Sequence, residues 1–139
     1  ITGAPLLRPI KTNPRTYDAV VDMALAQELA LDHASKYAIL ADWPANWVAS
    51  QQQNPLPVDW VLNVELPDGR LRNKVMETLR SGEPVAVIVP RFDMRVIAVV
   101  ALEYEPDPNA TFGNAVLSEI FDEFIVVEET RYYTVLVRP

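Results

Sequence analysis

The spacing of hydrophobic residues first predicts a long helix near the start of the chain. Apolar residues follow a helical period from Tyr17 to Ala41, Asn13 is a favourable N-cap residue, and Pro14 fits the first turn. The apolar surface of this helix is wide, as in helices that are buried on more than one side. At about 1.5 Å per residue, a helix over 14–41 is roughly 40 Å long. It would span or project from a compact domain of this size, which is about 37 Å across.

A polar, proline-rich segment then separates the N-terminal part from the rest. Asp42 is placed to cap a short helix in which Trp43 and Trp47, four residues apart, share one face. The segment 51–57 follows, and its glutamines and prolines are typical of a linker. We therefore expect one folded unit with three parts: an extended basic arm over 1–13, a helical part over 14–53 and an α+β sandwich over 58–139.

Beyond the linker, the pattern alternates between the periods of strands and helices. Residues 58–66 alternate apolar and polar side chains as a half-buried strand does, and residues 71–79 return to the helical period. Residues 85–89 form a continuous apolar run. The remaining elements are predicted as a strand over 95–104, a helix over 116–124, and strands over 125–128 and 132–137. This order is the βαββαβ pattern of a ferredoxin-like sheet, with an extra C-terminal strand.

The predicted α+β class also implies how the layers of the domain are arranged. Two right-handed crossovers place both helices of the βαββαβ pattern on one face of an antiparallel sheet. The long N-terminal helix could then cover the other face. The most apolar strand, 85–89, would lie at an edge of this sheet. Because apolar edge strands promote pairing with other chains, we expect the last strand or another chain to cover it.

Charge is distributed unevenly along the 139 residues, whose formal net charge is −7. The first 15 residues hold three basic side chains, Arg8, Lys11 and Arg15, and no acidic one. The segment 96–130 holds eight acidic residues and no basic one, whereas residues 70–80 hold four basic residues and one acidic residue. Two interpretations are open: these charges pair within the domain, or the acidic surface binds a basic partner such as the arm of a neighbouring copy.

Composition excludes several kinds of chemistry. The absence of cysteine excludes thiolate metal ligands, and a single histidine, His33, excludes a multi-histidine metal site within one chain. The four glycines form neither a Rossmann nor a Walker phosphate-binding loop. The acidic net charge disfavours nucleic acid as a partner, and no apolar run is long enough to span a bilayer. We expect no cofactor, no metal and no catalytic residue, and His33 is expected to be exposed or structurally satisfied.

Two groups of residues are candidates for contacts with a protein partner. Trp43, Trp47 and Trp60 flank the linker, where large aromatic side chains close a core or form an interface. A stacking platform for a sugar or a nucleobase is the alternative for these tryptophans. The three basic residues of the first 15 form the second group, which either docks on a neighbouring copy or lies on its own domain.

The turn after the strand at 58–66 is a candidate ligand site. It contains Asp68, Gly69 and Arg70. The run 61–79, a strand followed by a Pro-Asp-Gly turn and a helix, resembles the opening of ACT-type regulatory domains. This resemblance implies that an amino acid would bind at the strand-to-helix turn.

The hypothesis that the sequence favours is a non-enzymatic structural or interaction subunit that acts through association. It would be a homo-oligomer or a component of a larger particle, such as a viral or secretion-type assembly, with a protein or a second copy as its partner. The basic arm, the long helix and the apolar edge strand favour it. A small-molecule-binding regulatory domain is the alternative. The third hypothesis is an acid-rich hydrolase or cation-dependent enzyme, in which Glu103, Glu105 and Asp107 could hold a hard cation.

Overall fold

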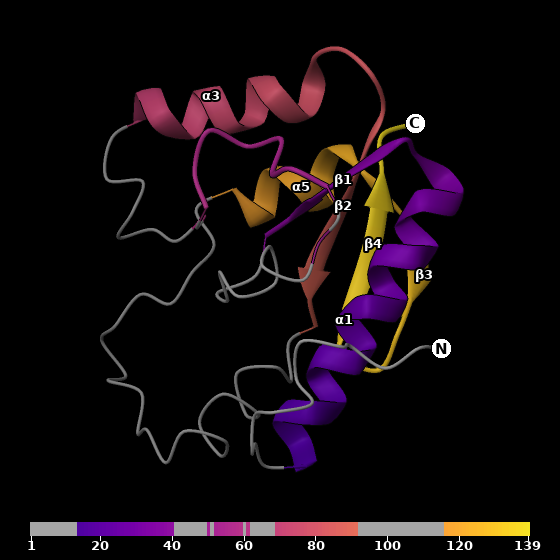
Figure 1. Cartoon of the computed structure of the whole chain (residues 1–139). Coiled ribbons are helices and arrows are strands. Elements are labelled where there is room, and N and C mark those ends of the chain that lie inside the picture. Colours follow the sequence, from indigo (N-terminus) through magenta and orange to yellow (C-terminus); the bar gives the residue numbers. More distant parts are fainter. Residues whose placement is uncertain (1–13, 41–49, 51, 60, 62–68, 92–115) are drawn as a thin grey trace.

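The computed structural model describes residues 14–40, 50, 52–59, 61, 69–91 and 116–139, and Figure 1 draws the others as a grey trace. The helices are α1 (Pro14–His33), α3 (Gly69–Arg80) and α5 (Leu117–Glu123). The strands are β1 (Lys36–Ile39), β2 (Val85–Pro90), β3 (Ile125–Glu129) and β4 (Tyr133–Val137). Helices and one mixed sheet of four described strands make the fold α+β.

The strands of the sheet lie in the order β1-β2-β4-β3. β1 pairs with β2 in parallel, whereas β4 pairs with β2 and with β3 in antiparallel fashion. Two hydrophobic clusters, one on each face of the sheet, form the core. α1 covers one face, and α3 and α5 cover the other (Figure 1). The helices thus form a layer on each side of the sheet.

Small side chains let α1 pack closely on the sheet. Ala19, Met23, Ala26 and Ala30 recur at three- and four-residue intervals and are all buried, so they form one face of the helix. This face meets bulkier side chains of the sheet, Tyr37, Ile39, Ile88, Tyr133 and Val135, and Tyr132 of the β3–β4 turn. Alanines on the helix and tyrosines on the sheet thus complement each other in size.

α1 is shorter than the sequence predicts. It ends at His33, whereas the hydrophobic pattern predicts a helix that continues to Ala41. Residues 36–39 form the strand β1 instead. With 20 residues, α1 is roughly 30 Å long, so the prediction of a helix as long as the domain is wrong. The part 14–53 is therefore not entirely helical, and its strand belongs to the same sheet as the strands after residue 84.

The reason for this difference is that β1 is buried on both of its faces. Tyr37 and Ile39 belong to the cluster under α1, whereas Ala38 and Leu40 belong to the cluster under α3 and α5. The two-residue period of a strand sends neighbouring side chains to opposite faces, and a helix does not. A short run of continuous apolar residues does not by itself distinguish a strand from a helix.

The apolar strand β2 lies in the interior of the sheet and not at its edge. β1 pairs with one side of it and the last strand, β4, pairs with the other. Both sides of β2 are thus occupied, so the described strands do not follow the ferredoxin-like order. The parallel partner of β2 is the strand at 36–39, which the hydrophobic pattern indicates as part of a helix. Of the two covers expected for the apolar strand, the last strand of the same chain is present.

Part of the predicted linker packs on the core. Leu56 is buried in the cluster under α3 and α5. The Asn54 side chain accepts a hydrogen bond from the Leu56 backbone N–H (3.0 Å) and donates one to the Val58 carbonyl (2.8 Å). Val58 and Asp59 form a bend, so the strand predicted over 58–66 is absent at these two residues. The polar linker residue Asn54 therefore stabilises a turn that brings an apolar neighbour to the core.

The other described elements agree with the hydrophobic pattern. The helices over 71–79 and 116–124 and the strands over 85–89, 125–128 and 132–137 are confirmed to within a few residues. α3 ends before Gly82, whose φ of 86° suits glycine because it has no Cβ. The strand predicted over 95–104 and the short helix after Asp42 lie outside the described residues. Among the helices that the structure describes, none combines the length and hydropathy that a membrane span needs.

Candidate functional site

Most of the site residues predicted from the sequence lie outside the described part of the chain. These are Arg8, Lys11, Trp43, Trp47, Trp60 and Asp68. Arg15 belongs to the first turn of α1, and Gly69 and Arg70 are the first two residues of α3, both exposed. α1 starts at the bottom of Figure 1 and α3 starts at its upper left. The structure therefore does not bring Arg15 together with the predicted ligand turn.

The predicted candidates for cation binding receive no support from the described residues. Glu103, Glu105 and Asp107 lie outside them. Within the residues that are described, no cluster of three or more His, Asp or Glu side chains is arranged to hold a metal ion. His33 is the last residue of α1, and its Nε2 atom lies 3.3 Å from Oε1 of Glu128 on β3. It is therefore an exposed histidine with a partner on β3.

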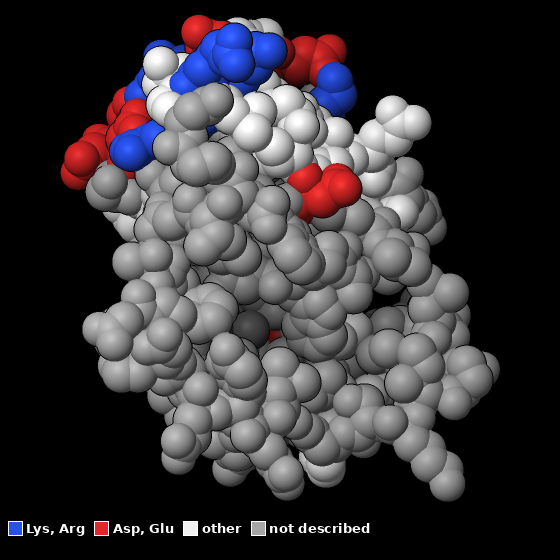
Figure 2. Space-filling view, turned by 90° about the vertical axis from the view of Figure 1, so that its left-hand side faces the viewer, with Lys and Arg blue, Asp and Glu red and all other residues white. Residues whose placement is uncertain are grey.

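The basic charges of α3 pair with the acidic charges of α5. Arg72 donates to Glu119 at 2.7 Å, and Arg80 donates to Glu119 at 3.1 Å and to Glu123 at 2.8 Å. Figure 2 shows basic and acidic atoms intermingled at the end of the molecule where α3 lies. Of the two interpretations of the charge pattern, pairing within the domain is the one that these helices realise. The described part of the acidic segment is thus already partly neutralised.

The ion pairs between α3 and α5 lead to a prediction about the protonation of Glu123. Hydrogen bonding to Arg80 lowers the pKa of Glu123 below its usual value of 4.5. A carboxyl with a lowered pKa in the folded state contributes stability above its usual pKa and loses that contribution as the pH falls through the lowered value. Replacing Arg80→Gln should therefore raise the pKa of Glu123 and reduce the loss of stability in acid. A carboxyl ¹³C titration by NMR measures the pKa directly.

The control for this prediction is Arg131→Gln, which removes an equal charge from the far side of the sheet. Arg131 lies 3.6 Å from Asp18 and does not contact the cluster. The Arg131→Gln variant should leave the pKa of Glu123 unchanged. An equal rise in both variants would show that overall charge, and not the hydrogen bond from Arg80, sets this pKa.

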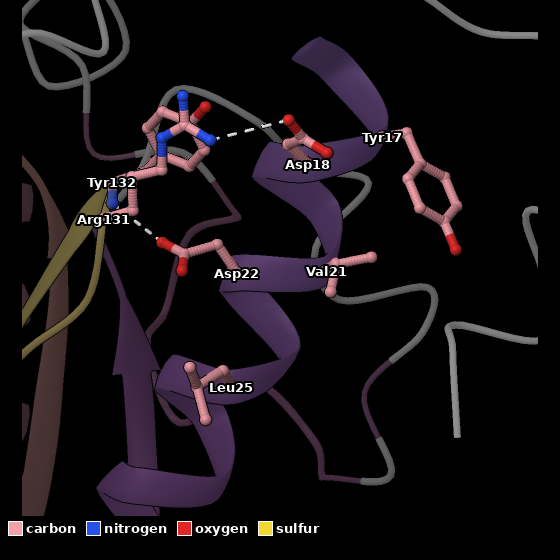
Figure 3. A pocket seen from close by; sticks show the side chains of 7 residues that line it. All are labelled: Tyr17, Asp18, Val21, Asp22, Leu25, Arg131 and Tyr132. Atoms are coloured by element: carbon pink, nitrogen blue, oxygen red, sulfur yellow. Dashed lines mark hydrogen bonds and ion pairs between the residues drawn. The ribbon is translucent and has the colours of Figure 1, made fainter. Parts of the chain in front are cut away.

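A hollow of about 230 Å³ lies where α1 meets the turn between β3 and β4 (Figure 3). Its lining consists of Tyr17, Asp18, Val21, Asp22, Leu25, Arg131 and Tyr132. Asp22 accepts two hydrogen bonds of 2.7 Å, from the Thr130 hydroxyl and from the Tyr132 backbone N–H. Asp18 pairs with Arg131, whose guanidinium lies 4.8 Å from the centre of the Tyr132 ring.

These contacts join α1 to the β3–β4 turn and leave little polar chemistry for a ligand. Both carboxylates of the hollow already have partners within the chain. In the hydrophobic cluster under α1, burial and then the negative charge of Asp22 raise the pKa of Tyr133, so its phenol stays protonated. The arrangement therefore has the character of a structural joint. Nothing in the sequence pattern marks Asp22, because its partners are more than 100 positions away.

The exposed edge of β3 has a different character, because it presents large apolar side chains to solvent. Ile125 is 52% exposed and Val126 is 49% exposed. Phe121 on α5, the element that precedes β3, is 49% exposed. In the described sheet, β3 pairs with β4 alone, so no described strand uses the backbone donors and acceptors on its other side. Sequence reasoning missed this surface, because a run of apolar residues in a strand normally indicates burial.

The chain was also compared with known proteins. No family model, no curated protein and no solved structure matches it significantly.

Proposed function

We propose that this protein is a non-enzymatic subunit that acts by self-association through the edge of β3 that no other described strand occupies. The observation that carries the proposal is the pair of half-exposed apolar side chains, Ile125 and Val126, on a strand with one described partner. Such an edge is a template for pairing with another chain. Burying the exposed half of each side chain contributes roughly 1 kcal/mol.

The proposal rests on fewer features than the sequence offered. The long helix and the apolar strand at 85–89 no longer favour association, because α1 is only 20 residues long and β2 has a partner on each side. The basic arm remains a prediction, because residues 1–13 lie outside the described part. The edge of β3 takes the place of these features, and it is the described surface that is richest in exposed apolar side chains.

The alternative, a small-molecule-binding regulatory domain, lacks a comparable observation. Gly69 and Arg70 are exposed at the start of α3, and Asp68 lies outside the described residues. The hollow beside α1 has carboxylates that are already bonded within the chain. We therefore make self-association the main proposal.

The proposal predicts that molar mass rises with protein concentration. Light scattering on the full chain and on a chain that starts at Pro14 should give the same rise, at low and at high salt, because an apolar edge does not depend on the arm or on unscreened charge. Val126→Lys, which places a charge on the edge, should keep the protein monomeric. Leu31→Lys is the control, because Leu31 is 44% exposed on α1 and lies outside β3. This variant should associate like the natural chain.

Two results would contradict the proposal. A monomer at every concentration would exclude self-association. A multimer that dissociates when the first 13 residues are removed would assign the association to the basic arm instead of the β3 edge.

A further inference from the structure

The two halves of β3 differ in chemistry. Its first three residues, Ile125, Val126 and Val127, are apolar, and its last two, Glu128 and Glu129, are acidic. Each acidic side chain has a basic neighbour in its own chain: Glu128 lies 3.3 Å from His33, and Glu129 lies 3.4 Å from Arg91. The apolar half is partly open to solvent, because Ile125 and Val126 are each about half exposed.

The register with β4 shows to which face each apolar side chain of β3 belongs. Val126 is opposite Leu136, which belongs to the cluster under α3 and α5. Ile125 is opposite Val137, which packs against the cluster under α1, as Val127 does. Directly opposite residues of an antiparallel pair share a face. Ile125 and Val127 therefore lie on the α1 face and Val126 lies on the other.

We propose that two copies of the chain pair β3 with β3 in antiparallel orientation, about a two-fold axis at Val126. The proposal deepens the proposed function, on which it rests, by naming the partner and the register. In this register Val126 is opposite its own counterpart, and Ile125 is opposite Val127 of the second copy. Every one of these pairs joins apolar side chains on the same face of the combined sheet.

The same register separates each acidic residue of β3 from its own counterpart, and Glu129 falls opposite Glu123 at the end of α5, whose charge is paired with Arg80. Glu129 is three residues from the axis, so the two Glu129 residues are about 20 Å apart at roughly 3.4 Å per residue. This is more than twice the screening length of about 8 Å at physiological salt. A parallel pairing in register would place Glu128 beside Glu128 and Glu129 beside Glu129, and like charges directly opposite are destabilising.

The β-bulge restricts the choice of register further. The pairing with β4 shifts between Val126 and Glu128, so Val127 and Glu128 both lie on the α1 face. A two-fold axis at Val127 would place Val126 opposite Glu128, although these side chains lie on different faces. Such a pairing breaks the alternation that a sheet requires. The axis at Val126, whose pairs within β3 all share a face, is therefore preferred to an axis at Val127.

A single-cysteine variant tests this register, because the natural chain contains no cysteine. In an antiparallel pair the Cα atoms of opposite residues are about 4.5–5.5 Å apart, within the range of roughly 4.4–6.8 Å that a disulfide bridges. Val126→Cys should therefore form a disulfide-linked dimer under copper phenanthroline and air. Glu129→Cys is the matched control, since it lies on the same strand and is similarly exposed.

We expect the Val126→Cys variant to cross-link at least about ten times faster than the Glu129→Cys variant, because only the former brings its Cα atoms within reach. Circular dichroism and the mass of the reduced variants check that both fold and associate like the natural chain. If the natural chain associates but Glu129→Cys cross-links as fast, or Val126→Cys does not, the register is overturned and the proposed function stands. If the natural chain is monomeric at every concentration, both are overturned.

Discussion

Replacing Ile88→Ala is expected to lower the free energy of unfolding by about 3 kcal/mol, within the range for large-to-small changes in a core. Ile88 is fully buried in β2, between β1 and β4 and under α1. The alanine would remove apolar atoms from the cluster and leave a cavity, because neighbours on three elements hold the surrounding shape. Urea unfolding followed by circular dichroism measures the loss.

The matched control is Ile125→Ala, the same substitution in the same sheet. Ile125 lies on β3 and is 52% exposed, so the free energy of unfolding of a monomeric sample should fall by less than about 1 kcal/mol. Equal losses in the two variants would contradict the placement of β2 in the interior and β3 at the edge. This comparison therefore tests the strand order on which the functional proposal depends.

Replacing Asp22→Ala is expected to lower the free energy of unfolding by about 2 kcal/mol, typical for hydrogen bonds to a charged group. The carboxylate accepts bonds of 2.7 Å from the Thr130 hydroxyl and the Tyr132 backbone N–H. Its removal leaves these donors without their partner at the joint between α1 and the β3–β4 turn. Urea unfolding again measures the change.

Asp18→Ala removes the same charge from the same helix and serves as the control. Asp18 lies 3.6 Å from Arg131, and both side chains are at least half exposed, so the loss should stay below about 0.5 kcal/mol. A similar loss in both variants would show that charge on α1, and not the two hydrogen bonds of Asp22, accounts for the effect. Asp22→Asn, which keeps a carbonyl acceptor, should lose less than Asp22→Ala.

Much of the secondary structure could be predicted because it depends on local patterns. α3 has buried Val75, Met76 and Leu79 on one face, and this helical spacing is visible without any tertiary contact. The buried strand at 85–90 is visible in the same way as a continuous apolar run. In both cases the pattern has one interpretation, since its length and flanking residues favour one element.

The strand at 36–39 shows where local patterns stop being sufficient. Its sequence, Lys-Tyr-Ala-Ile, continues the apolar character of α1, so a helix and a buried strand are equally consistent with it. The choice depends on β2, whose parallel pairing satisfies the backbone of β1. Because β2 begins about 50 residues later in the chain, no local pattern could reveal this partner. The errors in the helix length and in the predicted edge follow from this one segment, whereas the pairing of β3 with β4 is a separate departure from the predicted strand order.

The candidate site depended on tertiary structure more strongly than the fold did. The residues that the sequence singled out were chosen for their chemical type: tryptophans, basic residues and a Pro-Asp-Gly turn. The surface that now carries the proposal consists of Ile125 and Val126, whose type indicates a core. Whether an apolar residue is buried depends on what packs on it. Here α1 and α5 leave Ile125 and Val126 about half exposed.

The sequence by itself determined the α+β class, the positions of five described elements and the excluded cysteine and multi-histidine chemistry. These follow from composition and from periods of two and 3.6 residues, which act over short distances along the chain. Only the tertiary structure decided the strand order, the role of Asp22 and the exposure of β3. These depend on which distant segments meet, because hydrogen bonding and burial are settled between elements that are far apart in sequence.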